Sequence, residues 1–250
     1  MFLIKMNNAR LWKDLSNTLS TLIDEAIFNI TPEALLLRQM DPSHVAMIDF
    51  EWPSTVFDEY KCEEELKLSV NITEMLKLLR RVSSDESIQL TIDEDTGRLN
   101  INLKGTHVRN FKMPTLEPIG EDIPTPKVNF KAKIRMTTSS LKDAIDDASI
   151  VSDHVRFEAT TESLLMKGDG IMGSVSVEIG RESESILGFE ISETSKALFS
   201  LNYLSNIVKA ASVVSDIVTI EFSTDMPIRL DFEMLQEGKL QYYLAPRIED

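Results

Sequence analysis

The feature that most constrains this fold is a pattern that occurs four times along the chain. Each copy has an apolar stripe at helical spacing, then an aspartate, then residues that alternate between apolar and polar as in a strand. The aspartates are Asp24, Asp85, Asp153 and Asp216, so the module recurs at intervals of roughly 60 to 70 residues. One module has a helix stripe and a sheet face that both need a partner, and two modules can bury them against each other. We therefore expect an α+β fold with two similar domains, each made of paired helix-plus-strands modules.

Apolar residues at helical spacing predict four amphipathic helices. Their ranges are 9–22, 72–83, 139–151 and 202–214. Asn71 or Thr73 is expected to cap the second helix and Thr138 or Ser139 the third, because these side chains accept a hydrogen bond from a free helical N–H. Between the helices, short alternating runs predict strands. The clearest is a hairpin of residues 88–92 and 99–103 around a turn at 93–97.

A proline-rich segment, residues 113–127, separates the second module from the third. It holds four of the nine prolines. Each proline fixes its own φ, lacks an N–H and biases the preceding residue toward extended backbone. Such a segment is typical of neither a helix nor the interior of a sheet. We expect a surface connector between an N-terminal domain, residues 1–112, and a C-terminal domain, residues 128–250.

Composition limits the compartment and the partners. The single cysteine, Cys62, cannot form an intramolecular disulfide, which favours a reducing compartment. The N-terminal apolar run is too short for a signal peptide, and no window approaches the roughly 18 apolar residues of a membrane span. We expect a cytoplasmic protein with no membrane partner. The formal net charge of -15 argues at first sight against nucleic acid, because affinity for a polyanion comes mainly from Lys and Arg.

Four well-separated segments carry a likeness that extends over essentially the whole chain. They are MDPSHVAMIDF (40–50), DEYKCEEELKLSVNITEMLKLLRR (58–81), MPIRLDF (226–232) and LQYYLAPRIED (240–250). In this order they resemble the DNA sliding clamps of the proliferating cell nuclear antigen (PCNA) family. The resemblance implies the DNA clamp fold, in which three two-domain subunits form a closed ring round duplex DNA, with helices inside and sheets outside. The lack of long insertions favours an archaeal form.

The resemblance also implies a role and partners. The expected protein is a processivity factor rather than an enzyme, binds double-stranded DNA without sequence preference, and needs no cofactor or metal. Its implied clients are a replicative DNA polymerase, a flap endonuclease, a DNA ligase and the clamp loader, which bind through short PCNA-interacting peptides. An archaeal clamp would act in the cytoplasm at the nucleoid, and a eukaryotic one in the nucleus. The sequence leaves open whether the ring holds three identical chains or paralogues.

The expected helices answer the objection raised by the net charge. The first, second and fourth carry a net positive charge, whereas the third, with Asp143, Asp146 and Asp147, is net negative. The acidic character therefore lies outside the helices, which are the part of a clamp that faces DNA. The residues expected to contact phosphates are Lys13, Lys77, Arg80, Arg81 and Lys209. The alternative is that these cations are ordinary solvated faces of amphipathic helices.

The resemblance further implies a groove for client peptides beside the connector and the C-terminal segment. The matching positions are Met40, His44, Val45, Met47, Leu116, Ile119, Ile123, Pro227, Ile228, Ala245, Pro246 and Arg247. Methionine side chains adapt to varied ligands, and a proline-stiffened loop can pre-organise the edge of a groove. Taken alone, His44 is more typical of a structural histidine, and only the surrounding DPSHVAM pattern favours a binding role.

Ring closure requires an edge strand of one subunit to pair with an edge strand of the next. By resemblance the two edges are residues 106–113 and 171–179. The expected interface residues are Val108, Arg109, Phe111, Lys112, Val175, Val177 and Glu178. Apolar contacts should contribute more than the ion pairs, because exposed pairs are worth only about 0–1 kcal/mol each. The alternative is that both are plain edge strands.

An acidic, metal-dependent nuclease of α+β fold is the competing interpretation. The three histidines are scattered, and the chain has no nucleotide-binding, zinc-protease or serine-hydrolase motif. The acidic run from Asp93 to Gly97 could be taken for a metal loop, but a hairpin turn explains it better. The mass of the protein in solution separates the two functions, since a clamp is a trimer without catalysis.

Overall fold

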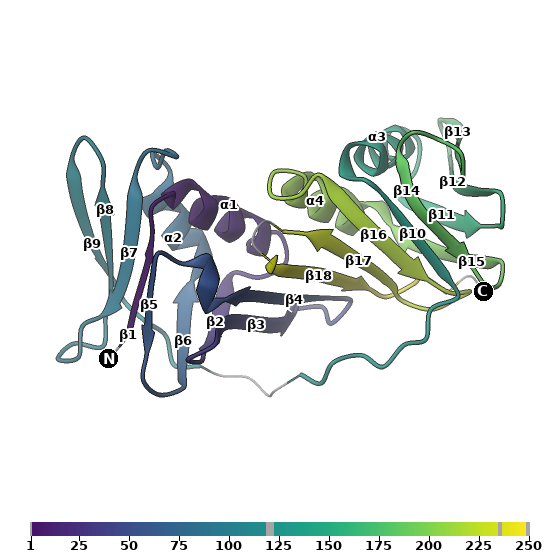
Figure 1. Ribbon diagram of the computed structural model, residues 1–250. Coiled ribbons are helices and arrows are strands. Elements are labelled where there is room, and N and C mark those ends of the chain that lie inside the picture. Colours follow the sequence, from purple (N-terminus) through teal and green to yellow (C-terminus); the bar gives the residue numbers. More distant parts are fainter. Residues whose placement is uncertain (1, 119–122, 235–236, 249–250) are drawn as a thin grey trace. The chain divides into compact units, whose positions relative to one another are not determined.

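The computed structural model describes residues 2–118, 123–234 and 237–248. The chain divides into two compact units (Figure 1). Unit 1 comprises Met1–Pro42, Ile48–Ile123 and Met234–Lys239, and unit 2 comprises Ser43–Met47, Pro124–Glu233 and Leu240–Asp250. The division between Ile123 and Pro124 falls inside the expected connector. Each unit also takes one short segment from the other half of the sequence, which no local pattern indicated.

Two helices and two antiparallel sheets make up unit 1. The elements are β1 (Phe2–Met6), α1 (Ala9–Leu19), β2 (Glu25–Ile30), β3 (Ala34–Met40), β4 (Ala46–Pro53), the 3-10 helix η1 (Ser54–Val56), β5 (Glu59–Cys62), β6 (Leu66–Asn71), α2 (Ile72–Leu79), β7 (Ser87–Ile92), β8 (Leu99–Lys104) and β9 (Val108–Met113). One sheet has the order β5-β1-β7-β8-β9, and the other places β4, β3, β2 and β6 side by side.

Unit 2 repeats this arrangement. Its elements are β10 (Ala132–Thr137), α3 (Thr138–Ser149), β11 (His154–Ala159), β12 (Ser163–Gly170), β13 (Gly173–Gly180), β14 (Ile186–Ile191), β15 (Ser195–Ser200), α4 (Leu201–Ala211), β16 (Ile217–Phe222), β17 (Ile228–Glu233) and β18 (Lys239–Leu244). The order β13-β12-β11-β15 forms one sheet, and β14, β10, β16, β17 and β18 lie side by side in the other. The expected fold of two similar α+β domains is confirmed.

The two modules of each unit are joined crosswise. The strand before each helix pairs with the strand after the other helix of the same unit: β1 with β7, β6 with β2, β10 with β16 and β15 with β11. The helices also pack in pairs, α1 against α2 and α3 against α4. Each module thus supplies the partner that the other needs to bury its helix stripe and sheet face.

The repeated aspartates explain how the modules are joined. The first N–H of each helix is a donor without an intrahelical partner, and a backbone carbonyl at the end of the other module accepts it. The four bonds are Ile72 N to Asp24 O at 2.9 Å, Leu201 N to Asp153 O at 3.0 Å, Thr138 N to Asp216 O at 2.8 Å, and Ala9 N to Glu86 O, next to Asp85, at 2.7 Å. The sequence landmark therefore marks the point where each module caps the helix of its partner.

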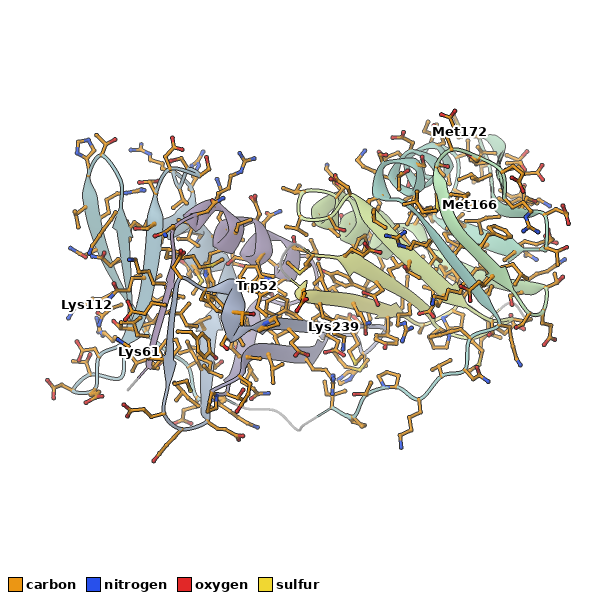
Figure 2. All side chains as sticks on the ribbon, in the orientation of Figure 1. Trp52, Lys61, Lys112, Met166, Met172 and Lys239 are labelled. Carbon is orange, nitrogen blue, oxygen red and sulfur yellow. The ribbon has the colours of Figure 1, made fainter. Side chains whose placement is uncertain are left out.

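The core of each unit lies between the helix pair and the sheets. In unit 1 the Trp12 ring of α1 lies 6.1 Å from the rings of both Phe28 and Trp52, and its Nε1 donates to Met75 Sδ of α2 at 3.3 Å. Figure 2 shows Trp52 among the interior side chains of this unit. In unit 2 the Phe157 ring packs edge-on against the Phe199 ring, with the two ring centroids 5.7 Å apart. Burying each such ring stabilises the fold by about 1.5–3 kcal/mol.

The helix limits differ from the expected ranges where local hydrogen bonds or long-range caps intervene. α1 ends at Leu19 rather than residue 22, because the hydroxyls of Ser20 and Thr21 bond to carbonyls in the last turn. Asn71 caps α2 as predicted, with its side chain accepting from the Glu74 N–H at 2.8 Å. The predicted cap of the third helix is wrong, since the capping position is Thr137, whose side chain makes no cap bond.

Several strands were not singled out from the sequence. They are β1, β5, β6, β14 and β15. β5 has four residues and no strict alternation of burial, and β14 is an edge strand with few buried positions. Such strands are specified by the neighbours with which they pair more than by their own period. The predicted hairpin of β7 and β8 is confirmed, with Gly97 at φ 65 in its turn.

Candidate functional site

The paired helices of unit 1 and the residues that follow α2 carry four of the five expected DNA-contacting cations. Lys13 on α1 donates from Nζ to the backbone carbonyl of Arg80 at 3.1 Å, so the end of α2 lies within reach of α1. Arg80 and Arg81 are exposed where α2 ends, and Lys77 is exposed within it. Lys77, Arg80 and Arg81 are neighbours in the sequence, and the fold brings Lys13, 67 residues from Arg80, to the same end of α2.

Two of the cations on this helix surface have carboxylate partners. Lys77 Nζ lies 2.6 Å from Glu74 Oε1, and the two side chains are 65% and 59% exposed. Arg10 Nε lies 3.4 Å from Asp14 Oδ2 on α1. Because exposed pairs contribute only about 0–1 kcal/mol, either cation can exchange its carboxylate for a phosphate at low cost. Arg10 was not among the predicted contacts, and it lies on α1 three residues before Lys13.

The helix surface of unit 2 is less basic. Lys209 is exposed on α4, as expected. On α3, Asp143, Asp146 and Asp147 are exposed, and Lys142 bonds to Asp146. This hydrogen bond raises the pKa of Lys142, so the only cation on the exposed face of α3 is already paired with a neighbouring carboxylate.

In unit 1 the expected client-binding positions lie along β3 and the connector. Met40 is the last residue of β3 and is partly exposed. The Leu116 N–H donates to the Ser69 carbonyl at 2.8 Å, which ties the start of the connector to β6. At the other end, the Ile123 carbonyl accepts from Arg38 Nη1 at 3.3 Å. Ile119 lies outside the described residues.

In unit 2 the C-terminal segment is held by backbone bonds. The Ala245 N–H donates to Val45 O at 2.9 Å, and the Arg247 N–H donates to Leu198 O at 2.7 Å. Arg247 Nη1 also lies 2.5 Å from His154 Nε2. His154 was not predicted as part of this region, because it is 93 residues away in the sequence and no local signal links the two.

The remaining client positions of unit 2 differ in exposure. His44 is exposed in the turn before β4, where its φ of 57 is a left-handed conformation that is uncommon for a residue other than glycine. Pro227 and Pro246 are partly exposed. Met47 is 4% exposed and Ile228 0% exposed, so in the chain by itself these two side chains belong to the core and support the surface from beneath.

The two expected subunit edges are edge strands, β9 in its five-stranded sheet and β13 in its four-stranded sheet. Val108 is 61% exposed. Phe111, Val175 and Val177 are partly exposed, and Glu178 is exposed. Both strands thus leave one row of backbone donors and acceptors available for another chain.

The two cations of β9 are already paired within the chain. Arg109 bonds to Glu86, and Lys112 Nζ lies 3.0 Å from Asp93 Oδ2. The Ser83 N–H, together with Arg109, holds the pKa of Glu86 below its ordinary value, and Lys112 does the same for Asp93. An ion pair with Glu178 of a neighbouring subunit would therefore compete with these internal pairs.

The described residues lack the features of a metal site, a reactive thiol or a membrane-spanning helix. Over residues 2–118, 123–234 and 237–248, no group of three or more His, Cys, Asp or Glu side chains is arranged to hold a metal ion. Burial raises the pKa of the Cys62 thiol, which makes it a poor nucleophile. Within the same residues, no helix has the length and apolar character needed to cross a membrane.

Comparisons with known proteins agree over the full length. Two family models match the chain: "Proliferating cell nuclear antigen, N-terminal domain" over residues 1–119 and "Proliferating cell nuclear antigen, C-terminal domain" over residues 124–247. The DNA polymerase sliding clamp 1 of Pyrobaculum aerophilum is 40% identical over 233 residues, 93% of either chain. The DNA polymerase sliding clamp of Thermococcus gammatolerans is 36% identical over 249 residues, 100% of this chain and 99% of that one.

Solved structures give the same result. PCNA from Thermococcus kodakaraensis aligns with a TM-score of 0.93 at 28% identity, over 99% of this chain and 100% of that one. A chain of the PCNA2–PCNA3 complex from Sulfolobus tokodaii aligns with a TM-score of 0.91 at 29% identity and the same coverage.

Proposed function

Because the chain belongs to the proliferating cell nuclear antigen family of DNA sliding clamps, we propose that three copies close into a ring round duplex DNA and tether replication and repair enzymes to it. The main support for this proposal is that the two family models together match almost the whole chain, residues 1–119 and 124–247. The paired helices and sheets of each unit support it. The same comparisons favour a clamp over the metal-dependent nuclease.

The proposed DNA contacts are Lys13, Lys77, Arg80, Arg81 and Lys209. They are supported by their places on α1, α2 and α4 or directly after α2, where Lys13 is partly exposed and the other four are exposed. Contacts from lysine and arginine to phosphates carry no sequence information and weaken as salt rises. α3 carries Lys142 and α4 carries Lys209 as their only cations, so the proposed contact with DNA is weak and comes mainly from unit 1. Weak, sequence-independent contact suits a protein that must slide.

Ring closure is proposed to occur by pairing of β9 of one subunit with β13 of the next. Both are edge strands with partly exposed apolar side chains, Phe111 on one and Val175 and Val177 on the other. Pairing would cover two aggregation-prone edges at once. Three identical chains are the simplest ring. A ring that includes paralogues is the alternative, because the name of the Sulfolobus tokodaii structure describes a complex of two different PCNA chains.

The proposed clients are a replicative DNA polymerase, a flap endonuclease, a DNA ligase and the clamp loader. The names of the relatives support the polymerase, and the other three follow from the family resemblance. Their peptides would bind along Met40, the connector and the C-terminal segment. We place the protein in the cytoplasm at the nucleoid, where its DNA partner lies in archaea, and assign it no catalysis of its own.

Loading on circular DNA tests the ring directly. The purified chain is loaded onto nicked circular DNA, and its retention is measured before and after the circle is cut. Retention on the circle and loss after linearisation are expected, because only a closed ring depends on the topology of the DNA. The solution mass should be about three times the 28.3 kDa of one chain. A monomer with EDTA-sensitive nuclease activity would contradict the proposal.

A further inference from the structure

A buried carboxylate in unit 1 has two cationic partners. Asp49 on β4 is 4% exposed. Its Oδ2 accepts from Arg38 Nη2 at 3.1 Å and from Lys239 Nζ at 2.7 Å (Lys239 is labelled in Figure 2). A buried carboxylate without a cation would be strongly destabilising. Either partner could in principle supply the compensating charge, so the presence of both requires a further explanation.

The two partners differ in what else they contact. Arg38 extends its second terminal nitrogen, Nη1, to the backbone carbonyl of Ile123 at 3.3 Å. Among the described residues, Lys239 makes its side-chain bond to Asp49 alone. A guanidinium is a planar fork whose donors can engage two acceptors at once. Arg38 therefore joins β3 and β4 to the connector, and Lys239 does not.

The sequence around Ile123 makes this contact important. Pro124 and Pro126 follow, and each lacks the N–H with which a backbone usually anchors itself. Residues 123–130 belong to neither a helix nor a strand, so no regular backbone hydrogen bonds fix their position. Because these prolines cannot donate, the segment is anchored through an acceptor instead, the Ile123 carbonyl, to which Arg38 of the neighbouring sheet donates.

We infer that Arg38 is a positioning residue for client peptides, which fixes Ile123 through its carbonyl while Asp49 holds the guanidinium in place. The inference rests on the proposed function, because it takes Ile123 as part of the client groove. Arg38 acts through Ile123 and does not need to touch the client. The competing explanation is that Arg38 only neutralises Asp49, in which case Lys239 should be equally important.

Two matched variants separate these explanations, because each removes one of the two cations that bond to Asp49. Arg38→Gln removes the hydrogen bond to Ile123, whereas Lys239→Gln keeps it. The probe is a fluorescein-labelled short PCNA-interacting peptide of a replicative DNA polymerase, titrated against the full-length ring. Arg38→Gln should weaken binding about fivefold, the equivalent of one hydrogen bond, and Lys239→Gln should leave binding unchanged. Equal reductions in affinity in both variants would overturn the inference.

A second readout does not depend on the client. The methyl resonance of Ile123, observed by methyl-labelled NMR of the intact ring, should shift in Arg38→Gln and stay in place in Lys239→Gln. An unchanged Ile123 methyl in Arg38→Gln would overturn the inference even if peptide affinity fell. Retention on nicked circular DNA should be the same in wild type and both variants, and its absence in wild type would count against the ring and not against Arg38.

A conservative variant covers the case in which Arg38→Gln does not fold. Arg38→Lys keeps a cation beside Asp49 but replaces the fork with a single ammonium. The protein should fold, lose affinity for the peptide and shift the Ile123 methyl as Arg38→Gln does. Full wild-type affinity in Arg38→Lys would show that charge alone matters and would overturn the positioning role.

Discussion

A methyl group added at Gly170 should disturb the hairpin that carries the proposed subunit edge. Gly170 ends β12 and pairs with Gly173 at the start of β13, across a two-residue loop of Ile171 and Met172. A Cβ at position 170 would lie 1.7 Å from the backbone oxygen of Val151 and 2.9 Å from its carbonyl carbon. Val151 lies two residues after the end of α3. The atoms that would clash belong to its main chain, so they cannot rotate away.

The size of the clash sets the expected effect of Gly170→Ala. Carbon and oxygen rarely approach closer than about 3 Å without strain, so the hairpin or the end of α3 must shift by about 1 Å or more. Overpacking of this kind costs about 1–3 kcal/mol. For a chain of this length, each kcal/mol lowers the melting temperature by about 2–4 °C. Because the shift displaces β13, association of subunits should weaken as well.

Gly180→Ala is the matched control, since Gly180 ends β13, the other strand of this hairpin, and a Cβ there meets nothing within 4 Å. Thermal unfolding followed by circular dichroism measures stability, and size-exclusion chromatography with light scattering measures the fraction of trimer at several concentrations. Gly170→Ala should melt earlier than Gly180→Ala. If the two variants have the same melting temperature, the reasoning that a Cβ at position 170 clashes with the Val151 backbone is wrong.

Three further changes test a helix cap, the helix surface and one ion pair. Asn71→Ala removes the side chain that accepts the Glu74 N–H, and should lower the free energy of unfolding by about 1 kcal/mol in urea titrations. Reversing Lys77 and Arg80 to glutamate should reduce retention on nicked circular DNA and lower the log–log salt slope by about 0.9 for each phosphate that is no longer bound. Glu86→Gln should cost stability mainly above pH 4.5, the ordinary pKa of the group, because its pKa is lowered in the folded chain. The stabilisation is complete above that value and is lost as the pH falls through the lowered pKa, so the difference from wild type in unfolding free energy should shrink on acidification.

Each of these predictions has an outcome that contradicts it. Asn17→Ala, at an exposed position within α1, controls for the loss of an asparagine, and an equal loss of stability there would argue against the cap. Lys61→Glu adds negative charge on β5, an edge strand of the five-stranded sheet rather than a helix, and equal loss of DNA retention would argue against the helix surface. A stability difference between Glu86→Gln and wild type that grows toward low pH would contradict the lowered pKa.

The exposure of candidate site residues could be predicted where a short segment of sequence shows a helical or strand period. Lys77, Arg80 and Lys209 fall on the polar side of a helical stripe, so their exposure followed from periodicity. The edge strands and the client positions came from the family resemblance, and their roles stay predictions. Met47 and Ile228 match the family pattern but are buried, because a one-dimensional pattern does not distinguish a surface from the layer beneath it.

The sequence by itself determined the four modules, their helices and the hairpin of β7 and β8, because helical and strand periods are set by residues a few positions apart. Only the tertiary structure decided how the modules combine. The Asp24 carbonyl caps a helix that begins at Ile72, Arg247 contacts His154, and Arg38 holds Ile123. These bonds join residues that are far apart in the chain and become neighbours only when crosswise strand pairing brings their backbones together. The repeated aspartates were therefore visible as a period, but their role in joining the modules was a property of the fold.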